Sequence, residues 1–219
     1  MRCDVGWTVA RWKAVSGLEH CFGGRDERPP PGVATLRQVH GRRVYDVEEV
    51  RGDGFEGDGI VTSVADARVG VWTADCVPVH LVARQPRVAA ALHCGWRGAA
   101  VGMIPAALEA LEGSYGLLPS HLEAALGPAI GGCCYEIGAE VRDAFRSRVG
   151  TALGDAGFEE RAGRLYLDLR TFLTAELAAL GVVHVERIGP CTACRTDLLH
   201  SFRKEHGSGR QLSWIGWCS

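Results

Sequence analysis

The chain has 219 residues, a formal net charge of -2, and ordinary proportions of hydrophobic (47%) and charged (23%) residues. This composition excludes disordered, collagen-like and coiled-coil proteins, and the small net charge does not favour binding to nucleic acid or to an anionic membrane. There is no apolar run long enough for a membrane span and no secretory signal pattern within Met1–Trp12, so we expect a cytoplasmic protein. In that reducing setting the nine cysteines are core residues, metal ligands or nucleophiles.

Short segments rich in valine follow one another through the first half of the chain. The Pro-rich stretch Asp26–Gly32 connects a short N-terminal segment, residues 1–32, to these segments. Because each is brief and bounded by Gly, Asp or Pro, we predict strands at Val33–Val39, Val44–Val50, Gly59–Thr62, Val69–Thr73, Val77–Ala83 and Arg87–His93. The step Gly41–Arg42 between the first two segments suits a hairpin.

Helical patterns come later in the chain. We predict helices over Gly98–Leu111, where Pro105 implies a kink or a later start, over Ile137–Val149 and over Asp168–Leu180, and two more strands at Val182–Ile188 and Gln211–Trp217. Early strands with helices in the middle favour the α+β class with mixed β-sheets over strict alternation. With no internal repeat and no clear boundary, residues 1–219 are predicted to form one domain.

Three candidate metal ligands lie at predicted strand ends. His40 stands in RQVHG before Gly41, Cys76 stands in TADCVP beside Asp75, and His93 opens HCGWRG. Two histidines and one cysteine with a free fourth position are a common catalytic zinc set. Since the chain has eight histidines and nine cysteines, the residues alone leave other sets open.

Other segments indicate anion binding. The strand-to-helix turn at Gly95 precedes Arg97, which favours phosphate or carboxylate, although Trp96 could simply pack in the core. The glycine-rich segment Gly127–Gly138 carries Tyr135 and Glu136, which are candidate ligand contacts. The basic segment Ser201–Gln211 is interpreted as an anion-binding loop or a solvated loop, with its cations at Arg203, Lys204 and Arg210.

Four further cysteines have weaker interpretations. The zinc deaminase signature, H-x-E followed by P-C-x-x-C, is matched by His184, Glu186 and the stretch Pro190–Cys194. Too few residues separate the two halves of this match for a deaminase. The Cys191 and Cys194 pair lacks the context of a redox motif, and no second C-x-x-C completes a zinc ribbon. Adjacent Cys133 and Cys134 are predicted to be core thiols, so all four cysteines are interpreted as structural.

Seven segments in one order resemble the YfiH-like group, labelled multicopper polyphenol oxidoreductases or laccase-domain proteins and also treated as zinc-dependent purine nucleoside phosphorylases. The segments are RQVHG (37–41), DGIVT (58–62), TADCVP (73–78), HCGWRG (93–98), 127–138, Cys191–Thr192 and 201–211. They extend over most of the chain, from about residue 18 to its end.

The resemblance implies a fold of α/β/β/α layers, a cytoplasmic setting and a monomer. It implies His40, Cys76 and His93 as ligands of zinc, with copper as an alternative metal. The implied reaction is phosphorolysis of adenosine, inosine, guanosine or methylthioadenosine, with adenosine deamination as a companion activity. Phosphate and purine nucleoside are then the partners, and the expected contacts are Arg25, Gln38, Arg97, Tyr135, Glu136 and Arg203, with Asp75 orienting a ligand or moving a proton.

Departures from the family pattern keep alternatives open. Cys94 stands where the family has alanine and is a candidate competitor for metal, Lys204 replaces an arginine, and the N-terminal part is short. The alternatives are a copper polyphenol oxidase, a hydrolase with a Cys76 nucleophile that edits cell-wall precursors, and a metal-dependent binding module. The absence of a His-x-His pair argues against the oxidase.

Overall fold

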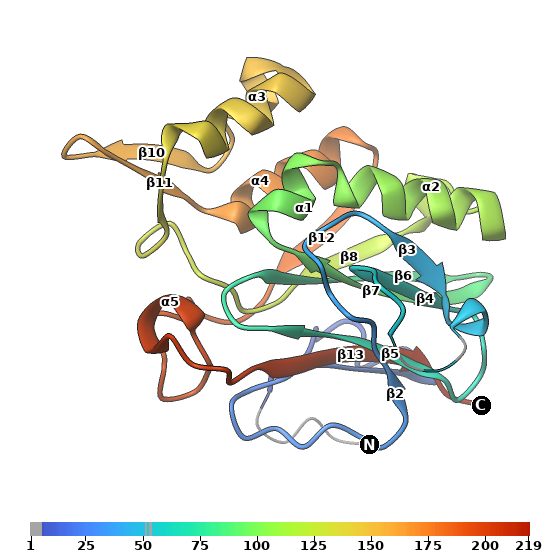
Figure 1. The fold of residues 1–219 in the computed structure, drawn as a ribbon. Coiled ribbons are helices and arrows are strands. Elements are labelled where there is room, and N and C mark those ends of the chain that lie inside the picture. Colours follow the sequence, from blue (N-terminus) through green and yellow to red (C-terminus); the bar gives the residue numbers. More distant parts are fainter. Residues whose placement is uncertain (1–5, 51, 53) are drawn as a thin grey trace.

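Two stacked β-sheets form the centre of the molecule, with the longest helices gathered on one side (Figure 1). The computed structural model describes residues 6–50, 52 and 54–219. Residues 1–5 of the predicted N-terminal segment therefore lie outside the description.

The larger sheet has six strands and contains most of the valine-rich segments. Its central hairpin joins β6 (Val77–Arg84) to β7 (Arg87–Cys94), and nearly every residue of both strands is buried because both faces of the sheet are covered. The full spatial order is β12 (His184–Arg187), β8 (Glu123–Leu126), β6, β7, β4 (Gly59–Thr62) and β3 (Val44–Asp46). The outer pairs β12–β8 and β3–β4 are parallel and the inner pairs antiparallel, so the sheet is mixed.

The smaller sheet has four strands and packs against the larger one. Its order is β1 (Leu18–Phe22), β13 (Gln211–Trp217), β5 (Arg68–Thr73) and β2 (Val33–Ala34). Alanines of β7 meet Val69 and Ile215 in the core between the sheets. These small side chains on one sheet and branched side chains on the other fill most of the interface, and the buried His80 of β6 stacks on Phe22 of β1 beside them.

The helices cover the outer face of the six-stranded sheet. They are α1 (Trp96–Ala100), α2 (Met103–Tyr115), α3 (Ala139–Gly154) and α4 (Leu169–Ala179). Leu92, Ile104 and Phe172 belong to the core that joins helices and sheet. The helix predicted over Gly98–Leu111 is divided at Gly102, whose φ of 90° ends α1 and precedes α2. Pro105 lies in the first turn of α2, where its missing N–H has no intrahelical partner to lose.

Smaller elements complete the fold. A three-stranded sheet of β10 (Phe158–Arg161), β11 (Arg164–Leu167) and β9 (Glu136–Ile137) projects beside α3, and the short α5 (Phe202–Glu205) lies near one end of β13 (Figure 1). Two short 3-10 helices occupy Val47–Glu49 and Pro119–His121. The predicted α+β class with mixed sheets is confirmed. In the described part of the chain, no helix combines the length and the apolar character needed to cross a bilayer.

The predicted hairpin at Gly41–Arg42 is wrong. β2 pairs parallel with β5 in the smaller sheet, whereas β3 pairs parallel with β4 in the larger one. The chain crosses between the sheets here, and His40 takes a φ of 60° on the way. The Asp58 carboxylate holds this crossing by accepting the backbone N–H groups of residues 39–41, which a two-residue hairpin would not require.

Candidate active site

The three predicted metal ligands meet at the end of the molecule where the chain passes between its sheets. Cys76 lies in the connection 74–76 that leads from β5 in one sheet to β6 in the other, and Asp75 has a φ of 88° there. His93 is on β7, paired with Pro78 of β6, and His40 lies on the crossing between β2 and β3. Left-handed backbone at non-glycine residues costs about 1–3 kcal/mol each and recurs at functional sites.

The donor atoms of His40, Cys76 and His93 all lie within 4.8 Å of one another. The two imidazole rings stand edge to face with their centroids 4.8 Å apart. A Cβ on Gly95 would lie 3.0 Å from both Cys76 Sγ and His40 Cδ2, so glycine keeps the space between the donors open. Two imidazoles and one thiolate around a space that a methyl group would fill suit a zinc or copper ion.

Asp58 is a member of this cluster that sequence reasoning missed. Its Oδ1 lies 2.8 Å from Nδ1 of His93, and its carboxylate accepts the N–H of His40 at 2.9 Å and of Gly41 at 2.7 Å. A carboxylate on one ring nitrogen leaves the other nitrogen to face a metal. Asp58 opens the segment DGIVT, which the family resemblance marked, but nothing in one sequence pairs it with His93.

Contacts among the side chains of this cluster shift the pKa values of Cys76 and His93. Burial raises the pKa of the Cys76 thiol, but contacts with His40 and His93 outweigh it and lower the pKa to about 6. Burial lowers the pKa of His93, but hydrogen bonds to Asp58 and Cys76 outweigh it and raise the pKa to about 9. At neutral pH Cys76 is therefore a thiolate, which is the form that binds metals and attacks electrophiles.

A cavity of about 620 Å³ opens from the cluster. Its aromatic and apolar lining includes Trp72, Tyr135 and Phe202, and its cationic lining consists of Arg97, Arg203 and Arg210. Among the described residues, none of these three guanidinium groups forms an ion pair with a carboxylate. Cations that line a cavity without such partners favour an anionic ligand.

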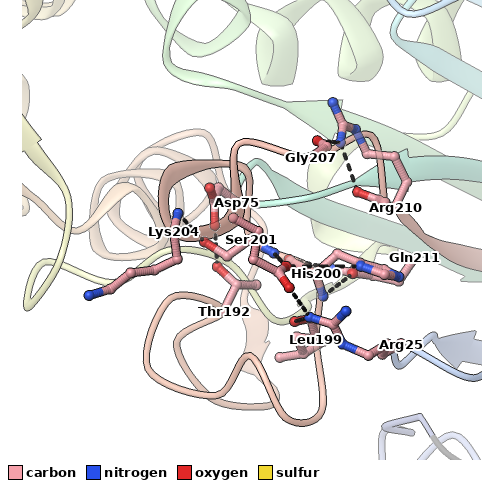
Figure 2. A network of polar contacts seen from close by, with 12 residues as sticks. Arg25, Asp75, Thr192, Leu199, His200, Ser201, Lys204, Gly207, Arg210 and Gln211 are labelled. Atoms are coloured by element: carbon pink, nitrogen blue, oxygen red, sulfur yellow. Dashed lines mark hydrogen bonds and ion pairs between the residues drawn. The ribbon is translucent and has the colours of Figure 1, made fainter.

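Asp75 connects the cavity wall to two neighbouring loops. Its carboxylate accepts the hydroxyl of Thr192 at 2.5 Å and the backbone N–H of Arg203 at 2.7 Å, and Figure 2 shows Thr192 directed at it. Both carboxylate oxygens thus accept hydrogen bonds from the protein. This arrangement suits a residue that positions the loops around Cys76 better than one that moves a proton.

The remaining predicted contacts divide into two groups. Gln38 and Tyr135 line the cavity, and the Gln38 amide makes two hydrogen bonds with the backbone of Trp72. Arg25 instead donates to Leu199 O at 3.0 Å and to Glu205 at 2.6 Å (Figure 2), and the exposed Glu136 side chain pairs with Arg164. Neither of these two lines the cavity.

Cys94 and Lys204, which depart from the family pattern, both lie outside the cluster of metal-type donors. Cys94 is fully buried in the core between sheet and helices and lies outside the donor cluster, because successive residues of β7 face opposite sides of the sheet. Lys204 is exposed, and its backbone N–H bonds Ser201 as part of the cap of α5. Competition by Cys94 for a metal at this cluster is therefore not supported.

Comparison with known proteins assigns the chain to one family. A family model described as multi-copper polyphenol oxidoreductase laccase matches residues 24–218. The chain belongs to this family. It is 37% identical over 190 residues to a purine nucleoside phosphorylase of Xylella fastidiosa, covering 83% of this chain and 71% of that protein.

Two further relatives support the same assignment. The purine nucleoside phosphorylase YfiH of Shigella flexneri is 32% identical over 189 residues, covering 85% of this chain and 74% of that protein. The crystal structure of YlmD from Geobacillus stearothermophilus superposes with a TM-score of 0.86 at 25% identity, covering 99% of this chain and 100% of that one. The predicted resemblance to the YfiH-like, laccase-domain group is thus confirmed.

Proposed function

We propose that this laccase-domain protein cleaves purine nucleosides with phosphate in the cavity beside His40, Cys76 and His93. One observation carries the proposal: a cluster of metal-type donors shares a single cavity with three guanidinium groups that have no carboxylate partner among the described residues. The names of the relatives, purine nucleoside phosphorylases, agree with this chemistry.

The donor set fits a bound metal ion. His40, Cys76 and His93 would hold zinc, since thiolate and imidazole are its usual ligands and Gly95 leaves room between them. When bound, zinc supplies Lewis acidity that polarises an oxygen of a ligand. Asp58 holds the His93 ring and the His40 backbone in position for this role.

The chain's own side chains define how substrate and phosphate would bind. Arg97, Arg203 and Arg210 offer forked donors to phosphate, and Trp72, Tyr135 and Phe202 offer ring faces to the purine. A phosphate oxygen bonds to the ribose C1′ while the bond from C1′ to the base breaks, and the base leaves with the bonding electrons and takes a proton. The proposed substrates are adenosine, inosine, guanosine and methylthioadenosine, with adenosine deamination as a companion reaction.

Incubation of zinc-loaded protein with inosine and phosphate tests the reaction. We expect hypoxanthine and ribose 1-phosphate in equal amounts, and Arg203→Met should raise the KM for phosphate. Arg164→Met, at an exposed arginine outside the cavity lining, is the matched control and should leave that KM unchanged. Absence of base release, or release at the same rate without phosphate, would contradict phosphorolysis, and adenosine without phosphate tests deamination separately.

A second function is favoured by the line of contacts from Cys76 through His93 to Asp58. A thiolate next to an imidazole that a carboxylate orients is the arrangement of a cysteine hydrolase. Amide bonds in cell-wall precursors would be the substrate class. A chelator that leaves thiols intact should stop phosphorolysis by the metal-loaded protein but leave such hydrolysis unchanged. A copper oxidase is less favoured because the chain has no His-x-His pair.

A further inference from the structure

Two pairs of cysteines that lie far apart in the sequence form a second sulfur cluster. Cys133 and Cys134 lie in the loop between β8 and β9, and Cys191 and Cys194 lie in the loop after β12. Their four Sγ atoms all lie within 4.8 Å of one another. Cys194 Sγ is 3.4 Å from Cys134 Sγ and 3.6 Å from Cys133 Sγ, and all four thiols are free.

This cluster corrects the prediction that Cys133 and Cys134 are core thiols. Cys133 and Cys194 are exposed, whereas Cys134 and Cys191 are partly buried. Small apolar residues that merely fill a core would not gather their sulfurs at the surface. The sulfurs are also too far apart for a disulfide, which requires about 2.05 Å. A different role must therefore explain why the two loops bring four thiols together.

Backbone contacts hold both loops in a geometry suited to a ligand. Ala129 and Cys191 form a parallel bridge, and Thr192 N donates to Ala129 O at 3.1 Å. Each cysteine pair lies on a tight turn, closed by Cys134 N to Gly131 O and by Cys194 N to Cys191 O. The N–H of Gly131 donates to Cys191 Sγ at 3.2 Å, a contact that stabilises a thiolate.

We propose that Cys133, Cys134, Cys191 and Cys194 bind one zinc ion as a four-thiolate structural site. A zinc–sulfur distance near 2.3 Å places tetrahedral thiolates about 3.8 Å apart, close to the separations between these sulfurs. Four protein ligands leave no open position for substrate, which distinguishes this site from the His40, Cys76 and His93 cluster. The exposed Cys133 and Cys194 provide the path by which the ion enters.

The proposed ion would link two loops that build the cavity wall. Tyr135 follows Cys134 and lines the cavity, and Thr192 follows Cys191 and donates to Asp75. The N–H of Ile130 donates to the carbonyl of Asp75 at 3.0 Å, which connects the first loop to the same residue. The site therefore acts on the cavity through loop position, and its existence does not depend on which reaction the cavity catalyses.

Native mass spectrometry of protein purified with zinc tests the assignment. We expect two zinc ions per wild-type chain, and one each in Cys194→Ser and in Cys76→Ser. Cys218→Ser, at a partly buried cysteine outside both clusters, is the matched control and should keep two. Cobalt loading gives a second readout: strong thiolate-to-cobalt absorption should persist in Cys76→Ser and fall in Cys194→Ser.

Two results would overturn the proposal. The first is a single zinc per wild-type chain that Cys76→Ser removes and Cys194→Ser does not. The second is a disulfide that joins two of these four cysteines in a peptide map of the unreduced wild-type protein, which would replace the metal site. Should Cys194→Ser fail to fold, cobalt titration of Cys76→Ser decides, since absorption typical of four thiolates supports the site and its absence refutes it.

Discussion

The two sulfur-containing clusters of this protein differ in donors, burial and surroundings. His40, Cys76 and His93 come from strand ends and a sheet crossing, face a cavity of about 620 Å³ and leave one coordination position free. Cys133, Cys134, Cys191 and Cys194 come from two loops, lie at the surface and offer a complete set of four thiols. An incomplete mixed donor set beside a cavity therefore suits catalysis, whereas a complete thiol set between loops suits a structural role.

The largest expected effect comes from replacing one cysteine in each cluster. Cys76→Ser should reduce base release to background, because it removes a ligand and the thiolate together, and should lower the melting temperature less than Cys194→Ser does, because Asp58 still holds His93 and the His40 backbone. Cys194→Ser should lower the melting temperature by roughly 5–10 °C, as loss of 2–3 kcal/mol does in a domain of this size, and retain measurable activity. Activity assays and thermal unfolding of both variants check this. Equal losses of activity and stability in the two variants would remove the distinction.

Asp58→Asn should weaken metal binding by His40, Cys76 and His93 and leave metal binding by the four cysteines unchanged. Loss of a carboxylate that orients a histidine ligand costs roughly 10–100-fold in metal affinity or activity, and Asp58 also holds the His40 backbone. Competition with a zinc-binding dye measures the affinity of the first site. Asp143→Asn, at an exposed position on α3, is the control, and a similar loss there would contradict a specific role for Asp58.

A buried histidine outside both clusters makes the stability of the fold depend on pH. His20 accepts the N–H of Val9 at 2.9 Å, and burial together with Lys13 lowers its pKa from 6.5 to about 4. The unfolded chain therefore binds more protons between these values, so stability falls as the pH drops below about 6.5. From pH 7 to pH 5 the loss is about 2 kcal/mol.

His20→Gln should flatten this acid slope while leaving both clusters intact. Urea unfolding of wild type and variant at pH 7 and pH 5 measures the difference. The buried His80, whose pKa is lowered mainly by burial and also by His20, should leave part of the acid slope in the variant. Parallel slopes in the two proteins would show that His20 does not carry the effect.

The smallest expected effect tests the connection between the two clusters. Thr192→Val keeps the shape of this buried side chain but removes the hydroxyl that donates to Asp75. Loss of one hydrogen bond of about 1 kcal/mol should lower kcat roughly fivefold, with zinc content unchanged. Thr171→Val, at a hydroxyl that bonds the exposed Arg187, is the control. A change in zinc content with Thr192→Val would place its role in ligation instead of positioning.

Local pattern was sufficient to predict most strands and the family. The segment Gly59–Thr62 forms a strand with the predicted bounds, and the valine-rich hairpin of β6 and β7 differs from the prediction by one residue at two ends. Buried strands of this kind are determined by their own β-branched residues and bounding turns. The strand predicted over Val33–Val39 is wrong beyond Ala34, because only Val33–Ala34 forms a strand. Arg37 then makes an isolated bridge to Glu56 as the chain leaves the smaller sheet.

The sequence by itself determined the α+β class and the family, and the resemblance to that family pointed to His40, Cys76 and His93, because these inferences depend on residue type and on short ordered motifs. Only the tertiary structure decided that Asp58 orients two of the donors, that Arg25 faces Glu205 instead of the cavity, and that four cysteines judged structural meet at one point. Such contacts join residues from 18 to 180 positions apart. Local propensity does not encode them, since they arise only when sheets and loops pack together.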